Sequence, residues 1–328
     1  MARKRRLKRA NLGARFSNYS TYWIGGLLVL ALLGVGNWFA HLPTARRASF
    51  GSFEPTLEAL GAVTADATDA IGLTGRDVAV EYLAPLSKGP LPFGLPQIVN
   101  TQKVPKDIQV LKRKGYWVGF SPTLGYPVWS AYAIPVKRVM KWPPERPAFL
   151  QDKQVFDSPT PDVYTGSGYD RGHMAPNYAI ATGYGRIAQR ETFLMTNIAP
   201  QRPDLNRGPW RILEQKLADD LSSIGDTVYV LVCTVPDASG AWLKKGRVRI
   251  PKGFAMIVAA VHDRQLRVFG IYMPQETASS KRPRYCFCSV RALEEATGLN
   301  FFPNLSPTLQ DAVEIPEANR FWPRWEVF

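Results

Sequence analysis

The sequence predicts an α+β fold with a central, largely antiparallel sheet, preceded by an N-terminal transmembrane helix. Short β-like runs cluster between residues 116 and 273, and only two good helical patterns interrupt them. Clustered strands with few helices indicate that the two kinds of element are segregated rather than alternating. With 45% hydrophobic and 21% charged residues, the 328-residue chain has the composition of a folded globular protein. A 19-residue uncharged run near the N-terminus predicts the transmembrane helix.

The first 22 residues carry seven Lys and Arg residues and no acidic residue, which is half of the formal net charge of +14. Residues 22–40 form the uncharged run, and a helix of that length reaches about 28 Å, close to the thickness of the hydrocarbon core of a bilayer. Tyr22, Trp23 and Trp38 suit its two interfaces. The preceding positive charges predict a cytoplasmic N-terminus and a catalytic domain in the periplasm or an equivalent extracytoplasmic space.

Alternatives to this topology remain open. The uncharged run also fits a buried helix or a cleavable signal sequence, although no convincing cleavage site follows it. An Arg-rich N-terminus without acidic residues is also typical of mitochondrial import, which would place the protein at the mitochondrial inner membrane.

The chain divides into five predicted segments. They are a basic cytoplasmic tail (1–21), the transmembrane anchor (22–40), a stalk or linker with one helix (41–106), a catalytic domain (107–305) and a C-terminal extension (306–328). Several prolines in residues 84–106 exclude a long helix or a central strand there.

Within the catalytic domain, two strands that flank the turn Pro122–Pro127 predict a hairpin. The predicted strands are Tyr116–Ser121, Val128–Ile134, Thr192–Ile198, Thr227–Thr234, Arg247–Ile250, Phe254–Val261 and Leu266–Met273. The two predicted helices are Asn206–Leu221 and Val290–Thr297. The first helix carries an apolar stripe that must face the sheet, made of Trp210, Leu213, Leu217 and Leu221.

Three cysteines and three histidines exclude a disulfide scaffold, a four-cysteine zinc site and most metal clusters. Cys286 and Cys288 alternate along a predicted strand, so both thiols point to one face. Cys233 lies in another predicted strand and could pair with either of them in an oxidising compartment.

His173 lies in the segment Tyr169-Asp-Arg-Gly-His-Met-Ala-Pro176. A lone histidine is usually structural or solvated, but Arg171 stands two residues before this one, and on an extended segment both side chains point to the same face. A neutral imidazole accepts a proton from water, and a neighbouring guanidinium binds phosphate and lowers the pKa of the imidazole. The pair therefore indicates chemistry on a phosphate ester.

A second polar group follows at Asn197, Asn206 and Glu214. Glu214 is eight residues beyond Asn206 on a predicted helix, so both flank the same buried edge. Two amides and a carboxylate near His173 would make an oxygen-only site that suits Mg²⁺ and is poor for Zn²⁺. In the alternative interpretation Asn206 only caps the helix and Glu214 is solvated, and the spacing alone does not choose between the two.

These segments resemble the DNA/RNA non-specific endonucleases, a family with the ββα-metal fold, an Asp-Arg-Gly-His signature, and secreted bacterial and mitochondrial members such as endonuclease G. The similarity includes Asp170-Arg-Gly-His, Thr196-Asn-Ile-Ala-Pro-Gln and Leu205-Asn-Arg-Gly-Pro-Trp with Glu214. It extends to Gly115-Tyr-Trp-Val-Gly-Phe-Ser, Val268-Phe-Gly-Ile-Tyr-Met-Pro and Thr297-Gly-Leu-Asn-Phe-Phe-Pro, and so covers about residues 110–305. Several spaced motifs in the same order are stronger evidence than one tetrapeptide.

The resemblance implies a role for each site residue. His173 is the general base that activates water, and Arg171 contacts phosphate. Asn206 is the direct protein ligand of one divalent cation, Mg²⁺ or alternatively Mn²⁺, while Glu214 holds a water on that ion. Asn197 supports the site. DNA and RNA are the implied substrates, and a homodimer is compatible with the resemblance.

One position departs from the family pattern. An arginine often follows the helix glutamate by four residues, but here that residue is Ala218. Arg207 or Arg138 would then have to contact the substrate phosphate instead. Arg186, Arg190 and Arg202 also surround the predicted site, although each of them by itself reads as solvated surface charge.

The sequence thus predicts a membrane-anchored, metal-dependent endonuclease that cleaves DNA and RNA with little sequence preference. Two rival predictions use the same scaffold. One is a catalytically weak nucleic-acid-binding or uptake protein, and the other is a phosphodiesterase that acts on small nucleotides.

Overall fold

The computed structural model describes residues 78–79, 90–219, 227–237, 239–243, 245–262 and 265–315, which belong to one compact unit that spans Arg76–Phe328. The predicted tail and transmembrane anchor lie outside these residues, as does most of the predicted stalk. Of the helices that the described residues form, none is both long and apolar enough to cross a bilayer.

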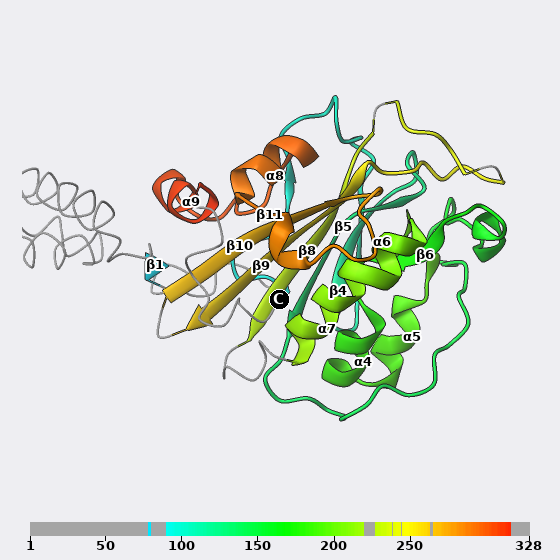
Figure 1. Ribbon diagram of the computed structural model, residues 1–328, viewed down its shortest axis with the longest axis horizontal. Helices are drawn as coiled ribbons and strands as arrows, with labels where there is room; N and C mark the ends of the chain where they lie inside the picture. The colour runs from blue at the N-terminus through cyan, green and yellow to red at the C-terminus, as the bar shows by residue number, and fades with distance from the viewer. Residues whose placement is uncertain are drawn as a thin grey trace, which may run out of the picture. The chain divides into compact units, whose positions relative to one another are not determined.

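An antiparallel sheet forms the centre of this unit (Figure 1). It has eight strands in the order β1-β10-β9-β8-β5-β4-β3, and β11 pairs with β10. The strands are β1 (Val78–Ala79), β3 (Gln109–Arg113), β4 (Tyr116–Ser121), β5 (Tyr126–Ile134), β8 (Val228–Val235), β9 (Gly253–His262), β10 (Gln265–Pro274) and β11 (Phe287–Cys288). The prediction of a largely antiparallel central sheet is therefore confirmed.

Helices cover both faces of the sheet. On β9, Phe254 packs against Trp210, with 5.5 Å between the ring centroids, on the side of α7 (Arg211–Asp219). Ile257, an odd number of residues later, points to the other face, where its partner Gly270 lies under Leu293 of α8 (Val290–Thr297). Because neither face is left to solvent, β8 and β9 are apolar along most of their length instead of alternating.

Further helices complete the two layers. On the side of α7 lie α4 (Asn177–Tyr184) and α5 (Arg186–Thr192), and α9 (Pro307–Glu314) lies beside α8 (Figure 1). A two-stranded sheet joins β2 (Gln97–Ile98) to β12 (Leu299–Asn300), and another joins β6 (Asp170–His173) to β7 (Ile198–Gln201). The second of these small sheets carries the candidate site.

The structure corrects several predicted elements. The bounds of β4 and α8 are as predicted, whereas α4, α5 and α9 were not predicted at all. The expected strand Thr192–Ile198 is instead the end of α5 and a 3-10 turn, η4 (Met195–Asn197), because its buried apolar residues pack inside the α-layer rather than in a sheet. The expected strand Arg247–Ile250 makes only an isolated bridge, between Arg249 and Trp242.

The possibility that Cys233 pairs with Cys286 or Cys288 is excluded in this fold. Cys233 lies on β8, and Cys288 lies on β11, with β9 and β10 between them. Three strand spacings amount to about 14 Å. A disulfide requires Cα atoms within roughly 7 Å. Cys286 does not belong to the strand either, because it ends the short helix η7 (Pro283–Cys286). All three thiols are free.

Candidate functional site

The candidate site is built on β6, the four-residue strand Asp-Arg-Gly-His. It pairs with β7 in the register Asp170 to Gln201 and His173 to Ile198. Gly172 lies so close to β7 that a Cβ atom there would be 2.4 Å from Oε1 of Gln201. This close approach explains why glycine separates the arginine from the histidine.

The His173 ring rests against two aromatic rings. Its centroid lies 4.8 Å from that of Phe193 and 5.4 Å from that of Phe149. Its Nε2 atom is buried and has no hydrogen-bond partner among the described residues. Burial, and then the positive charge of Arg146, lower the pKa of His173 to about 3. The imidazole is therefore neutral near pH 7 and able to accept a proton.

Arg171 shares the predicted face with His173, since its guanidinium lies 5.4 Å from the centroid of the same Phe149 ring. Its Nε and Nη2 atoms donate to the carbonyl of Pro161, at 3.1 and 2.7 Å. Nη2 also donates to the hydroxyl of Thr165 at 3.2 Å. The expectation that Arg171 lowers the pKa of His173 is not met, because Arg146 is the arginine whose charge does so.

Asn197 is fully buried and fixes the chain just after His173. Its Oδ1 accepts from the backbone N–H of Ala175 at 2.9 Å, and its Nδ2 donates to the carbonyl of the same residue at 2.9 Å. Nδ2 also donates to the carbonyl of Thr192 at 3.0 Å. The amide thus holds two segments together, in agreement with a supporting position.

Asn206 and Arg207 approach β6 from the following helical segment, and both bind Asp170. Nδ2 of Asn206 donates to Oδ2 of Asp170 at 2.9 Å. Arg207 donates to both carboxylate oxygens, at 2.8 and 2.6 Å. Although burial acts to raise the pKa of Asp170, the hydrogen bonds from Arg207 and Asn206 hold it below its ordinary value. Asp170, three residues from His173, therefore fixes Asn206 beside the strand.

The segment predicted as one helix, Asn206–Leu221, is broken into several elements. A short helix, α6 (Pro203–Leu205), leads into a π-type turn (Asn206–Trp210), and α7 follows. Gly208 has non-helical backbone angles, φ −97° and ψ −115°. Trp210, Leu213 and Leu217 are buried as predicted, whereas Leu221 lies outside the described residues. Asn206 itself has helical angles, φ −62° and ψ −47°, so it ends α6 instead of capping the start of one continuous helix.

Glu214 accepts a hydrogen bond at Oε1 from the indole N–H of Trp210, at 2.9 Å. Burial raises the pKa of Glu214 to about 8, opposed by this hydrogen bond and by the charge of Arg146. Glu214 is therefore not the solvated surface residue of the alternative interpretation.

Arg146 is a site residue that the sequence did not reveal. Its charge acts on both His173 and Glu214, and its guanidinium lies 5.6 Å from the centroid of the Phe193 ring. It is exposed, and no described residue forms a hydrogen bond or ion pair with it. Only the tertiary fold brings it to the site, from the loop before Phe149, and the sequence around it carries no signal beyond a proline-rich stretch.

The donor set fits one hard cation held by few protein atoms. Oδ1 of Asn206 accepts no hydrogen bond in the described part of the chain, which leaves a neutral oxygen available as a ligand. Within the same part of the chain, no group of three or more His, Cys, Asp or Glu side chains could hold a metal ion. A site of this composition suits Mg²⁺, which keeps several waters and tolerates a single protein ligand.

The other predicted arginines are placed as follows. Arg138 donates to Asp219 at 3.1 Å and to the hydroxyl of Tyr178 at 3.3 Å, and it also binds the carbonyl of Ala218. Ala218 is buried. Both predicted phosphate contacts, Arg138 and Arg207, are thus engaged with a carboxylate. Three further arginines are exposed at this side of the sheet, namely Arg186, Arg190 and Arg202.

Comparison with known proteins shows the family to which the chain is related. Residues 96–308 match the family model of the DNA/RNA non-specific endonucleases. The chain is 30% identical to a nuclease of Nostoc sp. over 250 residues, which are 72% of this chain and 89% of that protein. It is 30% identical to human mitochondrial endonuclease G over 216 residues, 60% of this chain and 70% of that protein. In a crystal structure titled as an EndoG/EndoGI complex, one chain matches with a TM-score of 0.55 at 21% identity, covering 66% of this chain and 91% of that one.

Proposed function

The chain belongs to the DNA/RNA non-specific endonuclease family, and on that premise we propose that it cleaves DNA and RNA with His173 as general base and one divalent cation held through Asn206. The observation that carries the proposal is the position of Asn206. Its amide is bound to Asp170, on the strand that ends in the neutral His173, while its Oδ1 remains available.

The proton of the attacking water goes to His173. Because Nε2 is enclosed by the aromatic packing, Nδ1 is the ring nitrogen left to accept it. Phe149 and Phe193 keep the ring in one orientation, and Asn197 fixes the backbone that follows. A positioned general base of this kind contributes about 10²–10⁴-fold to the rate.

A bound Mg²⁺ or Mn²⁺ would supply charge stabilisation for the phosphate and for the departing oxygen. Asn206 would hold it directly, and Glu214 would hold one of its waters. The neutral amide leaves most of the charge of the ion uncompensated, which favours binding of a phosphodiester. Arg146 and the free Nη1 of Arg171 would add positive charge on the side of His173.

The membrane anchor in residues 22–40 and the extracytoplasmic location remain part of this proposal. They rest on the N-terminal sequence, and the mitochondrial alternative is supported by the names of relatives such as human mitochondrial endonuclease G and human mitochondrial nuclease EXOG. Neither DNA over RNA nor a single strand over a duplex is favoured by the residues of the site.

A weaker catalyst is the second candidate, and the buried Ala218 favours it. The position at which the family often has an arginine carries no charge here, and Arg138 is held by Asp219. This candidate predicts binding of nucleic acid with slow cleavage.

The test is cleavage of supercoiled plasmid and of a structured RNA by the purified full chain, with Mg²⁺, with Mn²⁺ and with EDTA. We expect cleavage that EDTA abolishes, a loss of about 10²-fold or more in His173→Ala, and a comparable loss in Asn206→Ala.

Lys112→Ala is the control, because Lys112 alternates with Arg113 and so points to the sheet face opposite the site. Near wild-type cleavage by folded His173→Ala would contradict the proposal. Hydrolysis of a chromogenic phosphodiester with plasmid left intact would instead indicate a small-nucleotide phosphodiesterase.

A further inference from the structure

A basic and aromatic surface lies between β10 and α8, in the segment Ser279–Tyr285 and the start of η7. Tyr285 is 62% exposed, and Lys281 and Arg282 are exposed beside it. The ammonium group of Lys281 lies 5.4 Å from the centroid of the Tyr285 ring, and the guanidinium of Arg284 lies 4.9 Å from it. Arg284 also donates to the Tyr285 hydroxyl at 3.0 Å. The ring is therefore in contact with two cations while more than half of the side chain is exposed.

This segment is fastened directly to the elements of the site. Its Ser279 backbone packs against Gly208, so closely that a Cβ atom on Gly208 would be 2.9 Å from the Cα and O atoms of Ser279. Gln275 donates from Nε2 to the carbonyl of Pro200 at 2.7 Å, and its Oε1 accepts from the N–H of Arg202 at 2.9 Å. The segment therefore continues the surface of the π-type turn that begins with Asn206.

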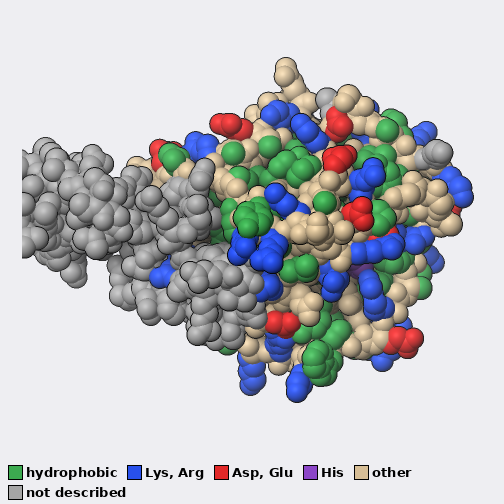
Figure 2. Space-filling model, in the orientation of Figure 1, with side chains coloured by type: hydrophobic (Ala, Val, Ile, Leu, Met, Phe, Trp, Pro, Cys, Tyr) green, Lys and Arg blue, Asp and Glu red, His purple; other side chains and the backbone are tan. Residues whose placement is uncertain are grey.

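Cations outnumber acidic residues on both sides of this contact. Arg207 and Arg211 are exposed on the turn and on α7, and Lys281 and Arg282 are exposed on the segment, whereas Asp204 and Glu276 are the exposed acidic residues nearest in sequence. Figure 2 shows several separate groups of Lys and Arg side chains on this face, with some Asp and Glu side chains between them. Residues 277–285 contain no acidic residue. An exposed tyrosine framed by cations is not explained by packing, because its ring contributes little to the core.

We propose that Lys281, Arg282, Arg284 and Tyr285 form a nucleic-acid-binding surface that extends the active site along one strand of the substrate. Tyr285 stacks on an unpaired base, and the cations contact the phosphates beside it. This combination of an aromatic platform and a basic track is how proteins bind single strands without reading sequence. The inference rests on the proposed nuclease function and adds a substrate feature to it, namely a preference for ends, loops or single strands over an uninterrupted duplex.

Equilibrium binding tests the surface without cleavage. The full chain is titrated in EDTA into a fluorescein-labelled 20-nucleotide single-stranded DNA, and anisotropy gives the Kd. We expect about tenfold weaker binding by Tyr285→Ala, since stacking on one base has this order of effect, and little change in Tyr285→Phe, which keeps the ring. Lys112→Ala, on the opposite face, serves as the control for loss of a surface charge. Equal affinities of the wild type and Tyr285→Ala would overturn the inference, as would an equal loss in Tyr285→Phe.

The salt dependence of the same Kd tests the cations. In Lys281→Ala/Arg282→Ala, the slope of log K against log salt should become shallower by about 0.7 for each lost phosphate contact. An unchanged slope would show that these cations do not contact the strand.

Kinetics then separate this surface from the catalytic residues. For the oligonucleotide with Mg²⁺, Tyr285→Ala should raise KM about tenfold and leave kcat unchanged, whereas turnover of bis(p-nitrophenyl) phosphate, which is too small to reach Tyr285, should stay the same. A loss on both substrates would show a structural role and overturn the inference. If the wild type hydrolyses neither substrate, the proposed function fails, and the binding measurements still decide whether this surface holds nucleic acid.

Discussion

The His173 side chain meets two opposing demands. Its packing against Phe149 and Phe193 gives the ring a fixed orientation, which a general base requires. The same burial, together with Arg146, lowers its pKa to about 3 and so weakens it as a base. A bound phosphodiester brings negative charge beside Arg146, which would reverse part of this shift when substrate is present.

The lowered pKa of His173 has a consequence for stability. In the unfolded chain this group binds a proton near its ordinary pKa of 6.5, whereas the folded protein excludes that proton down to about pH 3. The free energy of unfolding should therefore fall as the pH decreases below 6.5, because the unfolded state binds more protons.

Replacement of His173 by glutamine tests this expectation, since the amide does not titrate. Between pH 7.0 and 5.0 the wild type should lose on the order of 1 kcal/mol more unfolding free energy than His173→Gln. Urea unfolding at the two pH values measures both losses. An equal loss of unfolding free energy in the two proteins would contradict the expectation, because His173 would then bind a proton as readily in the folded protein as in the unfolded chain.

The sequence predicted the polar residues of the site but not their supports. His173, Asn197, Asn206 and Glu214 fall in short segments with a recognisable order. In the structure His173 ends β6, Asn197 bonds to the chain just after it, and Asn206 bonds to Asp170 at the start of the same strand. Arg146 and Phe149 lie in an irregular loop where no periodicity marks a residue. Their importance depends on a tertiary contact, which spacing along the chain does not encode.

The π-type turn at Asn206–Trp210 is the element that aims the predicted metal ligand. Pro209 cannot donate a backbone hydrogen bond, and Gly208 adopts angles outside the helical region, so the chain departs from regular helix at this point. The turn is also where the segment after β10 packs, at Ser279. Any side chain on Gly208 must therefore displace either the turn or this segment.

Gly208→Ala should consequently reduce activity more than stability. The added methyl group would meet backbone atoms at 2.9 Å, and overpacking of this kind costs about 1–3 kcal/mol and shifts the backbone. The backbone shift would also displace Asn206, and a displaced metal ligand should lower kcat/KM about tenfold or more. Plasmid cleavage and thermal unfolding of the same preparation provide the two measurements.

Gly183→Ala is the matched control. Gly183 lies on α4, and its added methyl group would approach Cδ of Pro135 at a similar distance, 3.0 Å. It should change stability while kcat/KM stays near that of the wild type. Full activity of Gly208→Ala would show that the turn does not position the site.

The regular elements were predictable where one local pattern determined them. The strands β4, β8, β9 and β10 follow from β-branched and aromatic runs, and α8 follows from its spacing with Ser289 as its N-cap and Gly298 as its C-cap. The elements α4 and α5 were missed because Gly183 and Gly185 interrupt them and many of their residues are small, so neither shows a helical stripe. The π-type turn was missed because a proline near a helix start usually marks its first turn.

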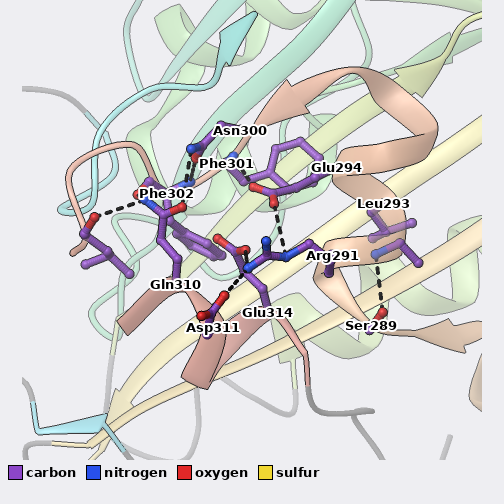
Figure 3. A network of polar contacts seen from close by, with 12 residues as sticks. Ser289, Arg291, Leu293, Glu294, Asn300, Phe301, Phe302, Gln310, Asp311 and Glu314 are labelled. Atoms are coloured by element: carbon purple, nitrogen blue, oxygen red, sulfur yellow. Dashed lines mark hydrogen bonds and ion pairs between the residues drawn. The ribbon is translucent and has the colours of Figure 1, made fainter. Parts of the chain in front are cut away.

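A polar network joins α9, in the C-terminal part of the described chain, to α8 (Figure 3). Arg291 lies 2.7 Å from Oε2 of the buried Glu314 and 2.6 Å from Oδ1 of Asp311. Glu294 accepts from the N–H of Phe301 at 2.7 Å and faces Glu314. Burial, and then the neighbouring carboxyl of Glu294, raise the pKa of Glu314 above its ordinary value.

This network should make the folded protein less stable as the pH rises from about 4.5 to about 8. A raised pKa in the folded state means that the unfolded chain releases the proton first, so the free energy of unfolding falls as the pH rises from 4.5 through the folded pKa. The charge of Arg291 lowers the pKa of Glu314 and so limits this loss of unfolding free energy, but it does not reverse the loss.

Glu314→Gln removes the titration while keeping the shape of the side chain. The unfolding free energy of this variant relative to the wild type should increase between pH 5 and pH 8. Asp311→Asn is a suitable control, because Asp311 bonds to the same arginine but is exposed. Parallel pH profiles for Glu314→Gln and the wild type would exclude this carboxyl as the source of the loss.

The fold class was predicted from the sequence. Of the helical layer formed by α8 and α9, only α8 was predicted. The antiparallel sheet follows from strands that are clustered and joined by short turns. The predicted C-terminal extension at 306–328 instead begins with α9, which packs on β10 as part of the same body. Its amphipathic stripe is only eight residues long, too short to distinguish a docked helix from a loop by pattern alone.

The separation of the cysteines by two intervening strands has a consequence for where this fold can operate. Burial raises the pKa of Cys233 and of Cys286, which keeps both thiols in their unreactive form. No described part of the body depends on a sulfur cross-link, so a reducing environment breaks no bond that holds it together. The described body can therefore fold where thiols stay reduced, without an oxidising step.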